Sequence, residues 1–174
     1  MGGNLKAVGS QKDSEVMEKL SAEGLKLERV SPIRVAYVQL TGPYENWGRG
    51  LMELKKWLDS QGVEIVGRPI GLFYDHPTET PVGELKSDAC FPIRGEIKPN
   101  AEFQVKELPG GDIATTRHVG PADQYTRTYG SFLEDLMSKG VVFYGPAREI
   151  FEEPRQDLRP GMGIRIEQLV RKNS

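Results

Sequence analysis

The stretch Gly145-Pro-Ala-Arg-Glu-Ile-Phe-Glu-Glu-Pro154 resembles an earlier stretch, Pro69-Ile-Gly-Leu-Phe-Tyr-Asp-His-Pro77. Each is a short apolar run bounded by prolines, a pattern that predicts a strand. Successive side chains of a strand point to opposite faces, so Ala147, Glu149 and Phe151 share one face of the later strand. This face is otherwise apolar, and Glu149 is therefore the residue that needs an explanation.

Aligning the prolines of the two stretches sets Leu72 opposite Glu149 and Tyr74 opposite Phe151. One stretch thus carries an apolar residue where the other carries an acid. This asymmetry makes Glu149 the first candidate for a functional residue.

The similarity of the two stretches extends over most of the chain. Thr41-Gly-Pro43 recurs as Val119-Gly-Pro121, at an offset of 78 residues. At this offset further positions match in character, namely Trp47 with Tyr125, Leu54 with Phe132, Leu58 with Leu136 and Gly62 with Gly140. Repeated matches at one offset predict an internal duplication.

Each half of the chain predicts the order strand, helix, strand, strand. Apolar residues spaced by three and four residues predict the helices, each of which buries one stripe. We expect strands at 30–41, 70–74, 85–93, 103–108, 113–118, around Glu149, and at 164–170, with a tight hairpin turn at Pro109–Asp112. The predicted fold is α+β, with duplicated strand–helix–strand–strand modules related by pseudo-twofold symmetry around a central cavity.

Helices on one side of such a sheet leave the opposite face to be covered by something else. We expect Leu72, Tyr74, Glu149 and Phe151 to line that concave face. The predicted domain spans residues 32–170, with halves at about 32–97 and 101–170. Residues 1–31 are expected to be an N-terminal leader with a short helix at 14–25, and residues 171–174 a tail.

Composition excludes several classes of function. The 174 residues carry a net charge of −2 with a pI near 5.8, which gives no basic footprint for nucleic acid. No apolar run is long enough for a signal peptide or a membrane span. Cys90 is the only cysteine, which fits a reducing cytoplasm. The two histidines, His76 and His118, stand in no metal-ligand spacing, so we expect no metal and no cofactor.

A carboxylate among apolar and aromatic groups suits two kinds of chemistry. It can pair with a flat, apolar cation, to which aromatic rings add cation–π attraction. It can also act as a general acid or base. Tyr37 and Tyr74 are the strand tyrosines that could turn toward the same ligand.

The chain resembles the GyrI-like small-molecule-binding family, which includes the DNA gyrase inhibitor protein and the effector-binding domains of AraC- and MerR-type multidrug-responsive regulators. The matching pieces run from about Ser31 to Val170, and they are specific by their order and spacing. They are Thr41-Gly-Pro-Tyr44, Ile70-Gly-Leu-Phe-Tyr-Asp-His-Pro77, Thr80-Pro81, Leu85-Lys-Ser-Asp-Ala-Cys90, Leu108-Pro-Gly-Gly111, His118-Val-Gly-Pro121 and Pro146-Ala-Arg-Glu-Ile-Phe151.

The resemblance implies two strand–helix–strand–strand modules around a cavity, in which Glu149 matches the family's pocket glutamate. The family usually has tyrosine two residues later, where this chain has Phe151. That departure favours binding over catalysis. Some stand-alone family members resemble hydrolases that open cyclopropane rings of DNA-alkylating natural products.

We therefore predict a stand-alone, cytoplasmic, bacterial binding domain for apolar or cationic planar small molecules. It would act in xenobiotic sensing, sequestration or transcription-related regulation, without direct nucleic-acid or membrane binding, as a monomer or homodimer. The alternatives are a cyclopropane-opening hydrolase, in which Glu149 is catalytic, and a gyrase-binding inhibitor, whose partner is a protein. The predicted ligand-binding residues are Glu149, Phe151, Tyr74, Leu72, Tyr37 and Ala147.

Overall fold

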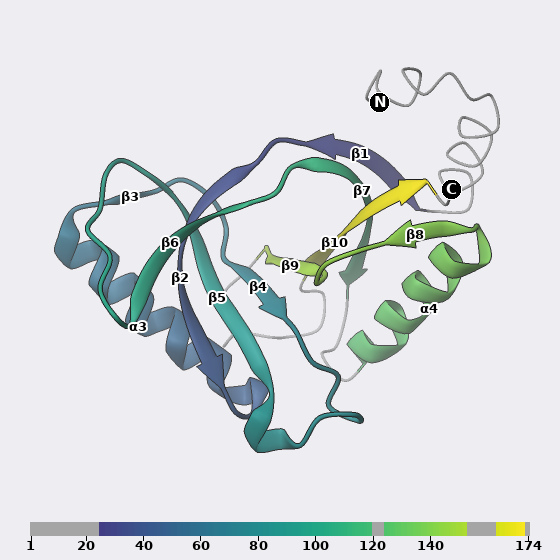
Figure 1. The fold of residues 1–174 in the computed structure, drawn as a ribbon, viewed down its shortest axis with the longest axis horizontal. Helices are drawn as coiled ribbons and strands as arrows, with labels where there is room; N and C mark the ends of the chain where they lie inside the picture. Colours follow the sequence, from purple (N-terminus) through teal and green to yellow (C-terminus); the bar gives the residue numbers. More distant parts are fainter. Residues whose placement is uncertain (1–24, 120–123, 153–162, 173–174) are drawn as a thin grey trace.

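The structure is a computed structural model that describes residues 25–119, 124–152 and 163–172. In these residues ten strands form one sheet, and two α-helices pack on it (Figure 1). Every recorded strand pair is antiparallel. The predicted α+β class is confirmed.

The strands follow one another across the sheet in the order β1-β7-β10-β9-β4-β5-β2-β6, with β3 paired to β5 and β8 to β10. Their bounds are β1 Lys26–Val30, β2 Ile33–Thr41, β3 Glu64–Ile65, β4 Ile70–Phe73, β5 Lys86–Arg94, β6 Phe103–Leu108, β7 Gly111–Val119, β8 Val141–Phe143, β9 Arg148–Phe151 and β10 Gly163–Lys172. β1 pairs with β7 although its residues fall within the predicted leader. Most of the leader, with the helix expected at 14–25, lies outside the described residues.

Helix α3 (Trp47–Gln61) follows a short 3-10 turn at Tyr44–Asn46. It buries the predicted stripe of Trp47, Leu51, Leu54 and Leu58, and it ends at Gly62, whose φ of 68° is left-handed. Glycine adopts this conformation without the steric cost that a side chain brings. Helix α4 (Tyr125–Ser138) buries Phe132 and Leu136.

Each half of the described chain has a strand, a helix and two further strands in the predicted order. The first half contains β2, α3, β4 and β5, and the second contains β7, α4, β9 and β10. β4 pairs with β9 in the middle of the sheet, and Figure 1 shows α3 and α4 at opposite ends with these two strands between them. The duplication, the pseudo-twofold axis and the central cavity remain predictions.

The predicted hairpin at Pro109–Asp112 is wrong, because β6 and β7 do not pair with each other. β6 pairs with β2 and β7 with β1, in one unbroken register from Val38↔Phe103 to Lys26↔Thr115. The chain therefore continues from β6 into β7 without turning back. The antiparallel partner of this segment likewise continues from β1 into β2. Figure 1 shows the resulting two-stranded ribbon as an arch that joins the two ends of the sheet.

Figure 1 shows this ribbon bending where β1 passes into β2 and β6 into β7, the stretch in which Pro32 lies beside Gly110. A Cβ atom on Gly110 would lie 2.6 Å from the carbonyl oxygen of Val30 and 2.7 Å from the nitrogen of Pro32. Both contacts are with backbone or ring atoms that cannot turn away. The bend thus depends on glycine because two backbones touch there.

We predict that Gly110→Ala destabilises the protein by about 1–3 kcal/mol, the usual cost of forcing extra volume into a packed site. Urea unfolding measures the change. Gly83→Ala is the matched control, since a methyl group at Gly83 meets no atom within 4 Å. Equal stabilities for the two variants would contradict the close approach at the bend.

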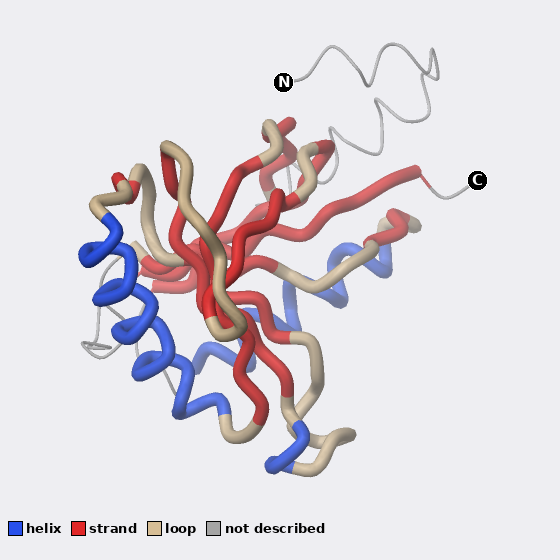
Figure 2. Tube along the Cα trace, turned by 60° about the vertical axis from the view of Figure 1, so that its left-hand side comes forward, coloured by secondary structure: helices blue, strands red, loops and turns tan. Residues whose placement is uncertain are grey.

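The two faces of the sheet differ in what covers them. Both helices pack on the same face, α3 over β2 and β5 and α4 over β7 and β10, where two apolar clusters form. Figure 2 shows the two helices (blue) as separate from each other, each lying along the strands (red). The opposite face carries a third cluster around Val35, Ile70, Leu72 and Cys90, and charged side chains. Neither described helix has the length and apolar content required to cross a bilayer.

Candidate functional site

Glu149 lies on β9 in the centre of the sheet, on the face that carries the helices. Its direct partners in the ladders are Gly71 on β4 and Ile166 on β10. Directly paired residues share a face, and Ile166 packs in the cluster beneath α4. The partly buried Glu149 side chain is therefore placed between the two helices rather than on the face opposite them.

The expected alignment of Leu72 with Glu149 is wrong by one residue. β4 begins at Ile70 and β9 at Arg148, so the strands are 78 residues apart, the same offset that relates the helices. An internal duplication at this offset would equate Gly71 with Glu149 and Phe73 with Phe151. Because a strand alternates with a period of two, a shift of one residue moves every side chain to the other face.

Gly71 leaves room for aromatic rings beside Glu149. A Cβ atom on Gly71 would lie 2.6 Å from Cε2 of Phe73 and 3.2 Å from Cε2 of Phe151. The rings of Phe73 and Phe151 thus pack against the backbone of Gly71, the residue paired with Glu149. An aromatic wall beside an acid is the arrangement that favours a flat cation.

The aromatic group on the α3 side continues with Trp47 and Tyr44. The ring of Trp47 lies 4.8 Å from that of Phe151 and 6.0 Å from that of Phe73, and Tyr44 meets Phe73 edge-on at 4.9 Å. Trp47 Nε1 donates a hydrogen bond of 2.9 Å to the carbonyl oxygen of Asp88. The Tyr44 hydroxyl donates to the carbonyl oxygen of Asp75 at 2.6 Å. These bonds hold both rings in place.

A second aromatic group comes from α4. Tyr125 lies 6.1 Å from Tyr129 in a stacked arrangement and meets the His118 ring at 5.5 Å. His118 Nδ1 lies 2.8 Å from the Thr128 hydroxyl. Tyr125 packs against the apolar clusters of both helices, and so it links the two sides of the site.

The charge of Glu149 acts on a tyrosine of each group. Burial is the main cause that raises the pKa of Tyr129, and the Glu149 carboxylate raises it further. Burial also raises the pKa of Tyr44, where a backbone hydrogen bond to Asp75 opposes the shift and the charges of Asp75 and Glu149 add to it. Both tyrosines therefore stay protonated at neutral pH, with hydroxyl groups near an acid.

The structure brings together only half of the predicted ligand-binding residues. Glu149, Phe151 and Ala147 lie on the helix face, Phe151 fully buried under α3 and Ala147 against the α4 cluster. Leu72, Tyr37 and Tyr74 belong to the opposite face, so the expectation that they share a surface with Glu149 is corrected.

On that opposite face Leu72 and Tyr37 pack in the third cluster, and the Tyr74 hydroxyl donates to Asp88. Their ring and methyl groups are separated from Glu149 by the sheet itself. A role for them in binding the same ligand as Glu149 stays an untested prediction.

Sequence reasoning missed the aromatic residues on the two sides of Glu149. The charge of Glu149 acts on Tyr44 and Tyr129. Phe73 and Trp47 pack on the Tyr44 side, and Tyr125 packs against Tyr129. The helix stripes indicated that the aromatic helix residues were core, and several are indeed buried or half-buried. The offset of 78 residues, applied to the strands as well as to the helices, would have identified Gly71 and Phe73. No group of three or more His, Cys, Asp or Glu residues able to hold a metal occurs within the described ranges.

An antiparallel sheet that holds a carboxylate between two aromatic groups defines a candidate ligand-binding domain. Residues 25–162 match the family described as the GyrI-like small molecule binding domain, and the chain belongs to that family.

Relatives with known names agree with this assignment. The DNA gyrase inhibitor of Escherichia coli (strain K12) is 29% identical over 109 residues, which cover 59% of this chain and 68% of that protein. Among solved structures, the C-terminal domain of EcmrR superposes with a TM-score of 0.74 at 15% identity, covering 85% of this chain and 97% of that domain. The protein SAV2435 bound to tetraphenylphosphonium superposes with a TM-score of 0.59 at 10% identity, covering 84% and 93%.

Proposed function

We propose that this domain binds small lipophilic cations and other planar apolar molecules, with Glu149 as the charge partner. The observation that carries the proposal is the position of this carboxylate between the aromatic residues of α3 and those of α4. Aromatic faces attract a cation, and an acid in partly apolar surroundings compensates its charge. The complex of SAV2435 with tetraphenylphosphonium, a lipophilic cation, supports this class of ligand for the fold.

In this proposal the ligand lies against Glu149 with rings on both sides. Tyr44 and Phe73 form one wall, with the fully buried Trp47 packed behind Phe73, and Tyr125 and Tyr129 form the other. Phe151 stabilises the wall from below, since its ring is fully buried against Trp47. The tyrosine hydroxyls can accept or donate a hydrogen bond to a polar group of the ligand.

The two walls also support the proposed duplication. Each half supplies one helix and the aromatic residue that precedes or begins it, and β4 and β9 pair about Gly71↔Glu149. In the first half the central position is Gly71, which makes room for the rings of Phe73 and Phe151. In the second half it is Glu149. A duplicated domain of this kind has one charged site on its pseudo-twofold axis.

We place the activity in sensing, sequestration or transcription-related regulation in a bacterial cytoplasm, with no DNA-binding domain in the described residues. The effector-domain fold shared with EcmrR supports a role as a ligand sensor. Cys90, the only cysteine, is buried and in no disulfide, which is compatible with a reducing compartment.

The test is the affinity of Glu149→Gln for tetraphenylphosphonium, measured by tryptophan fluorescence or calorimetry. We expect the variant to bind about 10- to 150-fold more weakly, because an interaction with a charged group is worth about 1.5–3 kcal/mol. Glu107→Gln, which neutralises an exposed glutamate on strand β6, is the matched control and should bind as the unmodified protein does. Equal affinity for all three proteins would refute the charge pairing.

Two other functions make different predictions for the same protein. The likeness to the gyrase inhibitor of Escherichia coli supports inhibition of gyrase, which a supercoiling assay with purified gyrase would detect. Hydrolysis requires turnover, so incubation with a cyclopropane-bearing alkylator should give a product that has gained one water. If the unmodified protein forms this product and Glu149→Gln does not, the protein is a hydrolase that uses Glu149, and the binding proposal is refuted.

A further inference from the structure

A cavity lies on the face of the sheet opposite Glu149, and four of its lining side chains are basic. Its volume is about 520 Å³, within the usual range for a small-molecule site. Four strands, β1, β7, β9 and β10, and the segment before β4 contribute to it. The lining residues are Lys26, Arg68, Thr115, Thr116, Arg117, Ile150, Glu152 and Arg165.

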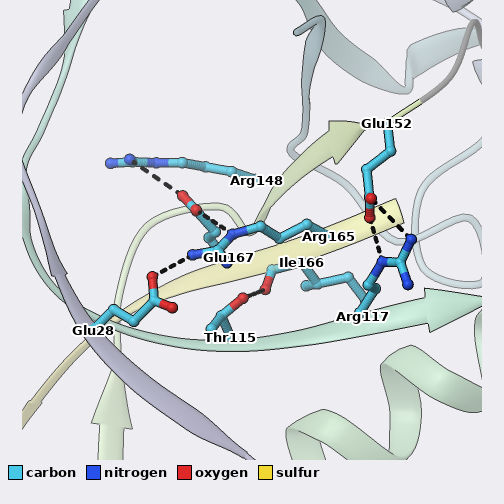
Figure 3. A network of polar contacts seen from close by, with 8 residues as sticks. All are labelled: Glu28, Thr115, Arg117, Arg148, Glu152, Arg165, Ile166 and Glu167. Atoms are coloured by element: carbon cyan, nitrogen blue, oxygen red, sulfur yellow. Dashed lines mark hydrogen bonds and ion pairs between the residues drawn. The ribbon is translucent and has the colours of Figure 1, made fainter. Parts of the chain in front are cut away.

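Three arginines converge on this cavity, two of them held by carboxylates and one by a backbone carbonyl oxygen. Arg117 binds Glu152 through two parallel hydrogen bonds, Nε to Oε1 at 2.5 Å and Nη2 to Oε2 at 2.9 Å. Arg165 donates to Glu28 at 2.6 Å and to Glu167 at 2.8 Å, and Figure 3 shows these pairs side by side along β10. Arg68 donates to the backbone carbonyl oxygen of Glu152. Glu152 is thus an acid surrounded by guanidinium groups.

The positive charges outnumber the negative ones. Among the described residues, Lys26, Arg68, Arg117 and Arg165 line the cavity and Glu152 is the one lining carboxylate. Glu28 and Glu167 on the Arg165 side still leave four described cations against three described acids. The hydrogen bonds of Arg117 lower the pKa of Glu152, and the charges of Arg68 and Arg165 add to this effect. The field at the cavity therefore favours an anion, although the whole chain has a net charge of −2.

Hydrogen-bond donors remain for a ligand. Among the described residues, Lys26 forms no ion pair, and the Nη1 groups of Arg117 and Arg165 donate no hydrogen bond. A guanidinium carries five N–H donors in a planar fork, of which each of these arginines uses two. The fork matches the oxygens of a phosphate as well as those of a carboxylate.

We propose that this cavity is a second binding site, separate from the Glu149 site, for a small organic phosphate. The phosphate group binds the free faces of Arg117 and Arg165 together with Lys26 and Arg68, and the organic part lies against Ile150. The cavity is larger than a phosphate ion needs, which leaves room for this second part. Glu152 competes with the ligand for Arg117 and so tunes the affinity.

Inorganic pyrophosphate is the probe, titrated by calorimetry at constant ionic strength against the full chain. We expect millimolar or tighter binding, and a loss of about tenfold or more in a Lys26→Gln, Arg68→Gln double variant, since each of these residues gives up a charged contact. Neither residue pairs with a side chain in the described residues, so the double variant should fold. Arg29→Gln, on the same strand as Lys26, is the matched control and should keep the affinity.

Glu152→Gln gives the sharper result, because it should tighten pyrophosphate binding severalfold by removing the competing charge. A residue that only supports the structure could not do this. Unchanged binding in both Glu152→Gln and the double variant, or no binding of pyrophosphate, would overturn the proposal. Glu149→Gln should leave pyrophosphate binding intact, which separates this site from the first.

The same phosphate chemistry occurs in free metabolites and in lipid headgroups. Co-sedimentation with phosphatidylcholine vesicles, with and without phosphatidic acid, distinguishes these sources. Pyrophosphate binding without vesicle binding supports a soluble phosphate. Binding to phosphatidic acid vesicles that the double variant loses supports a headgroup at the same site. Absence of both refutes the site.

Discussion

Lys106→Met is expected to lower the free energy of unfolding by about 3 kcal/mol or more, because it leaves a buried carboxylate without its cation. Asp88 on β5 is fully buried, and Lys106 Nζ on β6 lies 2.5 Å from its Oδ2. The Tyr74 hydroxyl donates to the same oxygen, and the Lys106 ammonium lies 4.1 Å from the centre of the Tyr37 ring. Asp88 Oδ1 has no hydrogen-bond partner among the described residues, so no other group there replaces the lost one.

Urea unfolding of Lys106→Met against the unmodified protein measures this loss. Lys98→Met, at an exposed loop position, is the control for the change of residue type. An Asp88→Leu, Lys106→Met double variant should recover much of the stability, since removing both members of a buried pair costs less than removing one. A single variant as stable as the control would show that the pair contributes nothing.

The group formed by Asp88, Lys106 and Tyr74 should also make the stability of the protein decrease at alkaline pH. Burial and the hydrogen bond to Asp88 raise the pKa of Tyr74 from 10.0 to about 12. Burial would lower the pKa of Lys106, but its hydrogen bond and attraction to Asp88 outweigh this and raise it. A group whose pKa is raised by folding stabilises the protein fully below its unfolded pKa and loses that contribution as the pH rises through the folded value. The urea concentration at the unfolding midpoint should therefore decrease as the pH rises from 10 to 12. The decrease should be less steep in Tyr74→Phe.

Phe151→Ala is expected to destabilise the protein by about 3–5 kcal/mol, the usual cost of removing a large buried ring. Phe151 is fully buried, its ring lies 4.8 Å from that of Trp47, and it fills the space over Gly71. The loss arises from the missing apolar contacts and from the cavity that remains. Phe151→Leu keeps most of the volume and should lose clearly less.

Ligand binding by Phe151→Leu and Glu149→Gln distinguishes the packing role of Phe151 from the charge of Glu149. In our proposal Phe151 supports the aromatic wall of the Glu149 site without contributing charge. Phe151→Leu should therefore keep the discrimination between tetraphenylphosphonium and a neutral ligand of the same shape, whereas Glu149→Gln should abolish it. Lost discrimination in Phe151→Leu would mean that the ring itself contacts the cation.

Local patterns predicted the parts of the fold that depend on local contacts. The spacing of Trp47, Leu51, Leu54 and Leu58 identified α3 and its buried side, and Gly62 marked its end. These features depend on neighbours three and four residues away, which the sequence shows directly. Strand β6 was also predicted with its observed bounds, Phe103–Leu108.

The errors came from contacts between distant segments. Pro109, Gly110 and Gly111 are typical of a hairpin turn, yet β6 pairs with β2 and not with β7. The proline-based alignment of the two strands was wrong by one residue, which exchanged the faces of Leu72 and Gly71. Neither error could be seen within a window of ten residues.

The sequence by itself predicted the α+β class, the order strand, helix, strand, strand in each half, and Glu149 as the unusual acid of the chain. Only the tertiary structure decided that Glu149 lies beneath the helices, between Tyr44 and Tyr129, and that the basic cavity lies behind it on the other face. The reason is physical. Alternation along a strand defines two faces, but the partners of the strand decide which face is covered, and those partners come from distant parts of the chain.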